Sequence, residues 1–203
     1  MGFFNLPNIP LFETALSEEI VNHLWGYVKE AKENCTHNLA GNIEKSLNLV
    51  DTNNYYFEQV LKPICIEYYS GLSDVTSLQS NHVNPKEFHL KEFWVNYMNK
   101  HEFNPVHCHG GVFSFVIWMQ IPFDSREQYE MPIAKNSNCP SASDFSFLYT
   151  DVLGQVTSYK INLSQANNGI MMVFPSSMNH QVYPYYKEEE QRISISGNIF
   201  WKG

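Results

Sequence analysis

The stretch QRISISGNIFW, Gln191–Trp201, alternates polar and apolar side chains as a strand with one buried face does. In a strand, residues two apart point to the same side. One face carries the isoleucines Ile193, Ile195 and Ile199, and the opposite face carries Arg192, Ser194, Ser196 and Asn198. The second face is therefore polar where a sealed core would be apolar.

Similar short runs fill the chain from about residue 87 onward. They are rich in Phe, Val, Ile, Tyr and Trp, and clusters of Gly, Pro, Asn and Ser separate them. We expect strands near 88–98, 112–121, 145–152, 156–163, 169–174, 180–184 and 192–201. Because no helical pattern lies between most of them, they predict a β-sandwich or barrel.

Residues 122–143 form the longest interruption, with weak periodicity and many loop-forming residues. We expect a long loop there, and loops of this length are often lids or binding loops, although disorder is the alternative. This loop is a candidate lid over a bound substrate.

The first 86 residues have a helical pattern instead. The segment Ser17–Glu33 places apolar residues at helical spacing behind Ser17, a suitable N-cap, and a second helix is expected near 54–69, with Pro63 interrupting it. We therefore expect a single domain over 1–203, in which residues 1–86 form a helical support region and 87–203 a β-barrel core.

Charge and composition exclude several classes of protein. With 13 basic and 21 acidic residues the net charge is -8, which repels nucleic acid, and no apolar run reaches the length of a membrane span. The four cysteines lack C-x-x-C spacing, and the N-terminus lacks the basic start and apolar run of a signal peptide. These features predict a cytoplasmic protein with reduced thiols, in the host cytoplasm if a phage encodes the chain.

The stretch NPVHCHGG, Asn104–Gly111, contains two histidines one residue apart. On a strand or strand end, His107 and His109 point to one side as two candidate metal ligands, while Cys108 points away. A third histidine, His180, follows the Pro-Ser-Ser corner of GIMMVFPSSMNH. Taken alone, the His-x-His pair is a weak signal, for which two partly exposed polar histidines are the favoured interpretation.

Two further polar positions lie on predicted strands. The guanidinium of Arg192, with the hydroxyl of Ser194 on the same face, is suited to binding a carboxylate, although a surface arginine is the alternative. Asn96 shares a face with Trp94 and faces either a pocket or solvent.

The order of these blocks resembles the Fe(II)- and 2-oxoglutarate-dependent oxygenase superfamily, whose signature is His-x-Asp, a distal His and an Arg-x-Ser-like carboxylate clamp. A closer resemblance is to the prolyl-hydroxylase-like oxygenases of that superfamily in marine phages and bacteria. Those proteins have a W-x-N strand, an H-x-H-P-G turn, an F-P-S-x-x-x-H corner and an R-I-S-I-S-x-N strand. The corresponding blocks here are FWVNYM, VHCHGG, VFPSSMNH and RISISGNI, in the same order over residues 88–201.

This resemblance implies a mainly β fold, the double-stranded β-helix or jelly-roll (cupin-like) barrel, with supporting N-terminal helices. It implies that His107, His109 and His180 ligate Fe(II), and that Arg192 with Ser194 holds the distal carboxylate of 2-oxoglutarate. Asn96 matches a pocket position beside the cofactor. The implied activity is that of a dioxygenase that uses oxygen and 2-oxoglutarate to hydroxylate a C–H bond of a peptide or small-molecule substrate. Succinate and CO2 are the coproducts, and a peptidyl proline is the default substrate.

Alternatives remain at the level of the sequence. His109 stands where the superfamily has a carboxylate, so it either ligates the metal or leaves a position open, and imidazole also suits zinc, copper and nickel. A cupin-like three-histidine metalloprotein that does not use 2-oxoglutarate is one rival. The other is a non-catalytic jelly roll with a structural or binding role.

Overall fold

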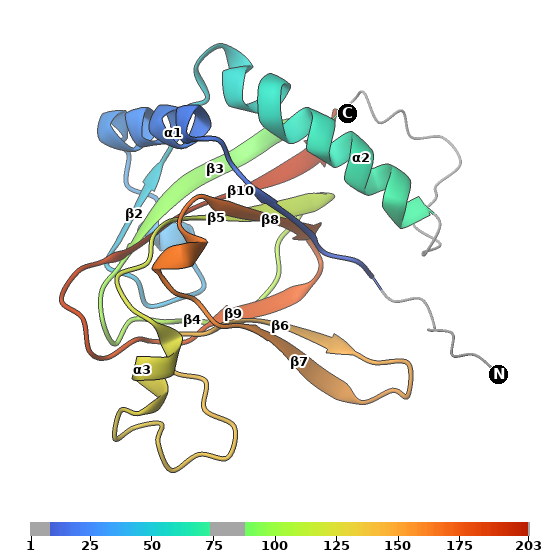
Figure 1. Cartoon of the computed structure of the whole chain (residues 1–203). Helices are drawn as coiled ribbons and strands as arrows, with labels where there is room; N and C mark the ends of the chain where they lie inside the picture. The colour runs from blue at the N-terminus through green and yellow to red at the C-terminus, as the bar shows by residue number, and fades with distance from the viewer. Residues whose placement is uncertain (1–8, 74–87, 203) are drawn as a thin grey trace.

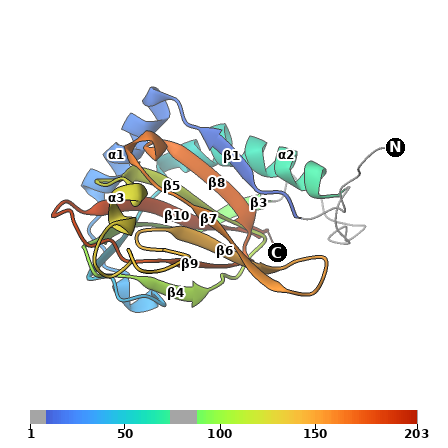
Figure 2. The ribbon, with the colours of Figure 1, turned by 60° about the horizontal axis from the view of Figure 1, so that its bottom comes forward.

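The computed structural model describes residues 9–73 and 88–202. Two antiparallel sheets face each other (Figure 1, and turned by 60° in Figure 2). The larger has the order β1 (Phe12–Ala15), β8 (Ile170–Pro175), β5 (Phe113–Gln120), β10 (Arg192–Trp201), β3 (Phe88–Met98), β2 (Lys45–Asn48). The smaller has the order β4 (Asn104–His107), β9 (Asn179–Val182), β6 (Phe145–Thr150), β7 (Val156–Ile161). From β3 to β10 successive strands alternate between the two sheets, apart from the β6–β7 hairpin. This alternation is the connectivity of a jelly roll.

The two faces of β10 separate two environments, as its alternating sequence predicts. Ile193, Ile195 and Ile199 pack into the core between the large sheet and the helices. The polar residues on its other face line a cavity between the sheets. A second apolar core, which includes Trp118, Phe147 and Phe174, fills part of the space between the sheets.

The helices α1 (Glu18–Glu30) and α2 (Lys62–Ser73) cover the outer face of the large sheet (Figure 1). The side chain of Ser17 accepts a hydrogen bond from the backbone N–H of Ile20, which confirms it as the N-cap of α1. A π-helical turn, η3 (Phe57–Leu61), leads directly into α2 beside Pro63. Because proline has no N–H to continue the α-helical ladder, the wider turn is the expected accommodation.

The sequence missed three short strands, each of four residues: β1, β2 and β4. β4 contains Pro105, which the edge of the small sheet tolerates because one side of an edge strand makes no ladder bonds. Since β1 and β2 extend both edges of the large sheet, the region 1–86 is more than a helical support. Its residues 1–8 and 74–86 lie outside the described ranges.

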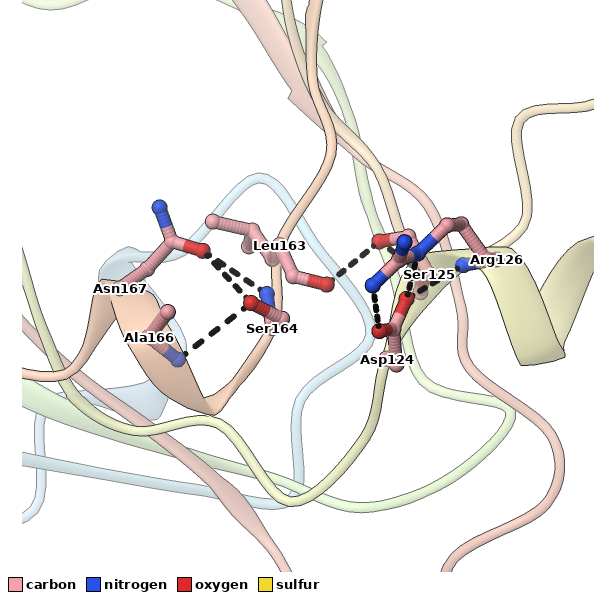
Figure 3. Close-up of polar contacts among 8 residues, drawn as sticks. Asp124, Ser125, Arg126, Leu163, Ser164, Ala166 and Asn167 are labelled. Carbon is pink, nitrogen blue, oxygen red and sulfur yellow. Dashed lines mark hydrogen bonds and ion pairs between the residues drawn. The ribbon is translucent and has the colours of Figure 1, made fainter.

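The predicted loop 122–143 contains a short helix, α3 (Ser125–Tyr129), which was not expected. Figure 3 shows how the start of this segment is fixed: Asp124 caps α3 and pairs with Arg126, and the hydroxyl of Ser125 donates to the carbonyl of Leu163 at 2.8 Å. Nearby, Ser164 forms a capping box on the turn η5 (Gln165–Asn167). The segment is therefore tied to the barrel at its beginning.

All seven predicted strands are present, and β3 and β10 have the predicted bounds. The four cysteines are unpaired, as the lack of paired spacing predicted. Within the part of the chain that is described, no helix has the length and apolar character needed to cross a membrane.

Candidate metal and cofactor site

Three histidines from the two neighbouring strands β4 and β9, and from the turn after β4, meet at one point. His107 ends β4 and is the cross-strand partner of His180 in β9, and the centroids of their rings lie 4.2 Å apart. The ring of His109 lies 5.0 Å from each of them. One ring nitrogen of each residue lies within 4.8 Å of the others, so the three predicted ligands converge. The thiol of Cys108 is not part of this group, as predicted.

Backbone carbonyls orient two of the rings. Nδ1 of His107 lies 2.7 Å from the carbonyl oxygen of Pro105, and Nδ1 of His180 lies 3.0 Å from that of Met178. Each Nδ1 must therefore carry the proton and donate it, so each Nε2 has a lone pair available as a metal ligand. This is the usual arrangement of metal-binding histidines. In this structure the Nε2 of His107 accepts from the side-chain amide of Asn104 at 3.2 Å, a contact that a bound metal ion would replace.

The surroundings of the cluster favour neutral imidazoles. Burial is the main cause that lowers the pKa of His180 to about 3, and the neighbouring His107 adds to the effect. Phe145 stacks against the His180 ring at 5.6 Å. Burial and then the charge of His107 lower the pKa of His109 to about 4. The rings are thus unprotonated at neutral pH, in the state that binds metal.

The turn after β4 places His109 through its backbone. The N–H of His109 donates to the carbonyl of Ser176 at 2.8 Å. Gly111 has φ +100°, and a Cβ there would lie 2.7 Å from the carbonyl oxygen of Ile199. The prediction that glycine allows a tight turn is therefore confirmed at this position. The buried hydroxyl of Ser114 connects Ser176, at 3.0 Å, to the side chain of Asn198, at 2.6 Å.

The cluster opens into a cavity of about 800 Å³. Arg192 lies in the same cavity, is 3% exposed, and donates from Nη1 to the carbonyl of Ser143 at 2.9 Å. Among the described residues, no ion pair involves this arginine. Burial lowers its pKa to about 10, so the guanidinium stays charged at neutral pH. The carboxylate of Asp144 stabilises this charge from beyond ion-pair distance, so the guanidinium keeps donors for an anionic ligand.

Two further predicted residues face this cavity. Ser194 is on the polar face of β10 and is the cross-strand partner of Asn96 in β3. Asn96 is 9% exposed, and its Oδ1 atom is buried without a hydrogen-bond partner. The prediction that Trp94 and Asn96 share a face is confirmed, because both line the cavity.

Sequence reasoning missed one wall of the cavity. Residues between 33 and 54 line it, including Glu33, Asn48 and Asp51. Their only sequence signal is a high density of Asn and short apolar runs. By contrast, no residue of the segment 122–143 lines the cavity, so the structure does not support a lid there.

A family model described as "Putative 2OG-Fe(II) oxygenase" matches residues 92–198 of the 203, which is more than half of the chain and includes all six predicted site residues. The chain belongs to this 2OG-Fe(II) oxygenase family. No curated protein matches the sequence.

Solved structures share the fold of this family member at low sequence identity. A prolyl-4-hydroxylase from Pseudomonas putida aligns with TM-score 0.55 and 12% identity, over 95% of this chain and 92% of the other. The viral collagen prolyl hydroxylase of Paramecium Bursaria Chlorella virus-1, solved as its 2OG complex, aligns with TM-score 0.53 and 9% identity, over 93% and 94% of the two chains. A 2OG-Fe(II) oxygenase-family oxidoreductase from Burkholderia pseudomallei aligns with TM-score 0.52 and 14% identity, over 94% and 84%. These likenesses confirm the jelly-roll fold.

Iron and 2-oxoglutarate, which the name of the oxygenase family implies, suit the residues of this site. Three neutral imidazoles form a donor set that binds Fe(II). The buried charge of Arg192 favours an anionic ligand in the same cavity. The unpartnered Oδ1 atom of Asn96 can accept a hydrogen bond from a donor group there. The chemistry of the site therefore agrees with the family.

Proposed function

We propose that the protein is an Fe(II)- and 2-oxoglutarate-dependent dioxygenase that hydroxylates a C–H bond of a second substrate. The observation that carries this proposal is that one cavity contains both a three-histidine cluster and a buried arginine that forms no ion pair among the described residues. Iron and 2-oxoglutarate, when bound, would allow O2 to oxidise the C–H bond of the second substrate, and 2-oxoglutarate would be converted to succinate and CO2.

In this proposal His107, His109 and His180 hold the metal. The carbonyls that accept from His107 and His180 keep their Nε2 atoms directed at it. His109 is the third ligand, because its ring lies close enough to the rings of His107 and His180 for all three to bind the same ion. Three neutral ligands leave the metal its full double charge, which favours a dianionic cosubstrate.

Arg192 binds the distal carboxylate of 2-oxoglutarate in this scheme, and the Ser194 hydroxyl adds a hydrogen bond. A guanidinium has a planar set of donors that matches a carboxylate in a bidentate way. Asn96 lies opposite Ser194 on the neighbouring strand and lines the same cavity, so its amide nitrogen is the group that would donate to this ligand.

The second substrate enters along the wall formed by residues 33–54, which lies outside β10 and the histidine cluster. A peptidyl proline is the first candidate, because two of the similar folds are named prolyl hydroxylases. That argument is one of analogy, so a peptide or a small molecule fits the proposal equally.

The test is succinate formation from 2-oxoglutarate by Fe(II)-loaded protein under air, first without a second substrate and then with proline-rich peptides. Wild type is expected to form succinate, and Arg192→Met to lose this turnover at low 2-oxoglutarate concentration. Arg126→Met is the matched control, since Arg126 is exposed, pairs with Asp124 and does not line the cavity.

Two results contradict the proposal and identify the rivals. Stoichiometric metal without binding or turnover of 2-oxoglutarate indicates a cupin-like metalloprotein. Absence of bound metal in protein purified without an affinity tag and loaded with Fe(II) indicates a non-catalytic jelly roll.

A further inference from the structure

The orientation of Arg192 depends on few protein contacts. Its Nη1 donates to the backbone carbonyl of Ser143 at 2.9 Å, and its Nη2 lies 2.9 Å from the sulfur of Met98. A thioether is a weak acceptor, so the Ser143 carbonyl is the stronger of these two partners. These contacts engage two of the five N–H donors of the guanidinium, so the fork keeps donors for a carboxylate.

Ser143 has an unusual backbone. It is fully buried and has φ +71°, in the left-handed region that non-glycine residues rarely adopt. Such a conformation costs of order 1–3 kcal/mol and persists only where the surroundings fix it.

Hydrogen bonds from three neighbouring segments fix Ser143. Its N–H donates to the carbonyl of Pro184 at 2.8 Å, and its hydroxyl donates to the hydroxyl of Ser125 at 3.0 Å. The Ser125 hydroxyl in turn donates to the carbonyl of Leu163, the contact drawn in Figure 3. The carbonyl of Ser143 accepts the bond from Arg192, so the N–H, the hydroxyl and the carbonyl of Ser143 each form a hydrogen bond.

Both ends of the segment 122–144 contribute to the surroundings of Arg192. The guanidinium carbon lies 5.9 Å from the centre of the Phe123 ring, near the start of the segment. Asp144 follows Ser143, is fully buried, and accepts a hydrogen bond from the Tyr129 hydroxyl at the end of α3. The segment that the sequence suggested as a lid therefore packs around the arginine instead.

We infer that Ser143 is a positioning residue for the 2-oxoglutarate site: its left-handed backbone aims the carbonyl that fixes the guanidinium of Arg192. This inference rests on the proposed function, since it concerns how the same site recognises the distal carboxylate. It assigns the segment 122–144 the task of holding the guanidinium of Arg192 from outside the cavity.

Two substitutions at one position test this inference. In Ser143→Val the β-branched side chain disfavours the left-handed backbone, so the peptide rotates and its carbonyl leaves Arg192. In Ser143→Gly, the matched control, glycine accepts this backbone and keeps the carbonyl in place, and only the hydroxyl is lost. Anaerobic binding to Fe(II)-loaded protein is measured for 2-oxoglutarate and for 2-oxobutanoate, which lacks the distal carboxylate, together with the Tm of each variant.

Ser143→Val is expected to weaken 2-oxoglutarate binding by about tenfold or more, the equivalent of one hydrogen bond to a charged group. Its affinity for 2-oxobutanoate should stay within about twofold of wild type, because chelation at the metal is untouched. Ser143→Gly should stay within about threefold of wild type for both ligands. A folded Ser143→Val protein that binds 2-oxoglutarate as wild type does would overturn the inference.

If Ser143→Val does not fold, Ser143→Ala takes its place, because it lacks the hydroxyl as Ser143→Gly does but still disfavours the left-handed backbone. Ser143→Ala is expected to bind 2-oxoglutarate about two- to fivefold more weakly than Ser143→Gly, and equal affinities of these two variants overturn the inference. Failure of the proposed function gives a different result: wild type then shows no preference for 2-oxoglutarate over 2-oxobutanoate.

Discussion

Acidification of the metal-free protein from pH 7 to pH 5 should destabilise it through the histidine cluster. Burial lowers the pKa of His180 to about 3 and that of His109 to about 4, against 6.5 for the free side chain. A group whose pKa is lower in the folded state binds fewer protons there. The free energy of unfolding therefore decreases as the pH falls below 6.5, because the histidines bind protons in the unfolded chain but not in the folded protein.

The size of the effect follows from these values. Between pH 6.5 and pH 5, about 1.5 pH units, the unfolded chain binds a proton at each histidine and the folded protein does not. This lowers the free energy of unfolding by about 2 kcal/mol for each histidine, and by about 4 kcal/mol for the two together. His107, whose pKa burial also lowers, acts in the same direction. Asp144 opposes them: burial raises the pKa of its carboxyl from 3.8 to about 6, and its protonation recovers about 1.4 kcal/mol by pH 5. The net loss in the free energy of unfolding is about 2–3 kcal/mol.

The assay is urea unfolding of chelator-treated protein at pH 7 and pH 5. His180→Phe, which places an apolar ring among the aromatic neighbours of His180, should remove about 2 kcal/mol of the acid loss. His37→Gln, a change at an exposed histidine outside the cluster, should leave the loss unchanged. Equal acid loss in wild type and His180→Phe would refute the reasoning.

Three further predictions concern the site. Arg192→Met should weaken 2-oxoglutarate binding by at least about thirtyfold, measured by anaerobic titration, because a buried charge-assisted pair is lost; an affinity equal to that of Arg126→Met excludes the carboxylate clamp. His109→Asp should keep one equivalent of iron by metal analysis, since a carboxylate is a common third ligand, and His109→Ala should bind iron more weakly; full iron binding in His109→Ala argues that His109 is not a ligand. Ser114→Ala should lower the free energy of unfolding by about 1–3 kcal/mol, since it leaves the buried side chains of Ser176 and Asn198 without their shared partner. Denaturant unfolding measures this change, and an unchanged free energy means that the network has no net stabilising effect.

Much of the fold can be predicted from the sequence because its strands are long and strongly patterned. The alternation in Gln191–Trp201 predicts both the buried face of β10 and its polar, cavity-lining face. The strands that were missed have four residues each, too few for a period of two to stand out, and β4 also contains a proline. The meeting of His107 with His180 depends on the pairing of β4 with β9, which no local pattern encodes.

The contacts around Arg192 could not be predicted from the sequence. Ser143 is a serine in a loop-like stretch, and nothing in its identity indicates a left-handed backbone or a carbonyl that points at residue 192. Residues 33–54 also lack a strong period, and their place as a cavity wall depends on the pairing of β2, which lies within this range, with β3. In both cases the relevant property arises from tertiary structure.

The most direct test of the account is anaerobic titration of Fe(II)-loaded protein with 2-oxoglutarate, observed by visible absorption. Chelation of the cosubstrate to iron on the three histidines should produce a charge-transfer band that saturates at one equivalent of iron per chain. The band should require far more 2-oxoglutarate in Arg192→Met than in Arg126→Met. Absence of a band in the wild-type protein at millimolar 2-oxoglutarate would contradict the central claim.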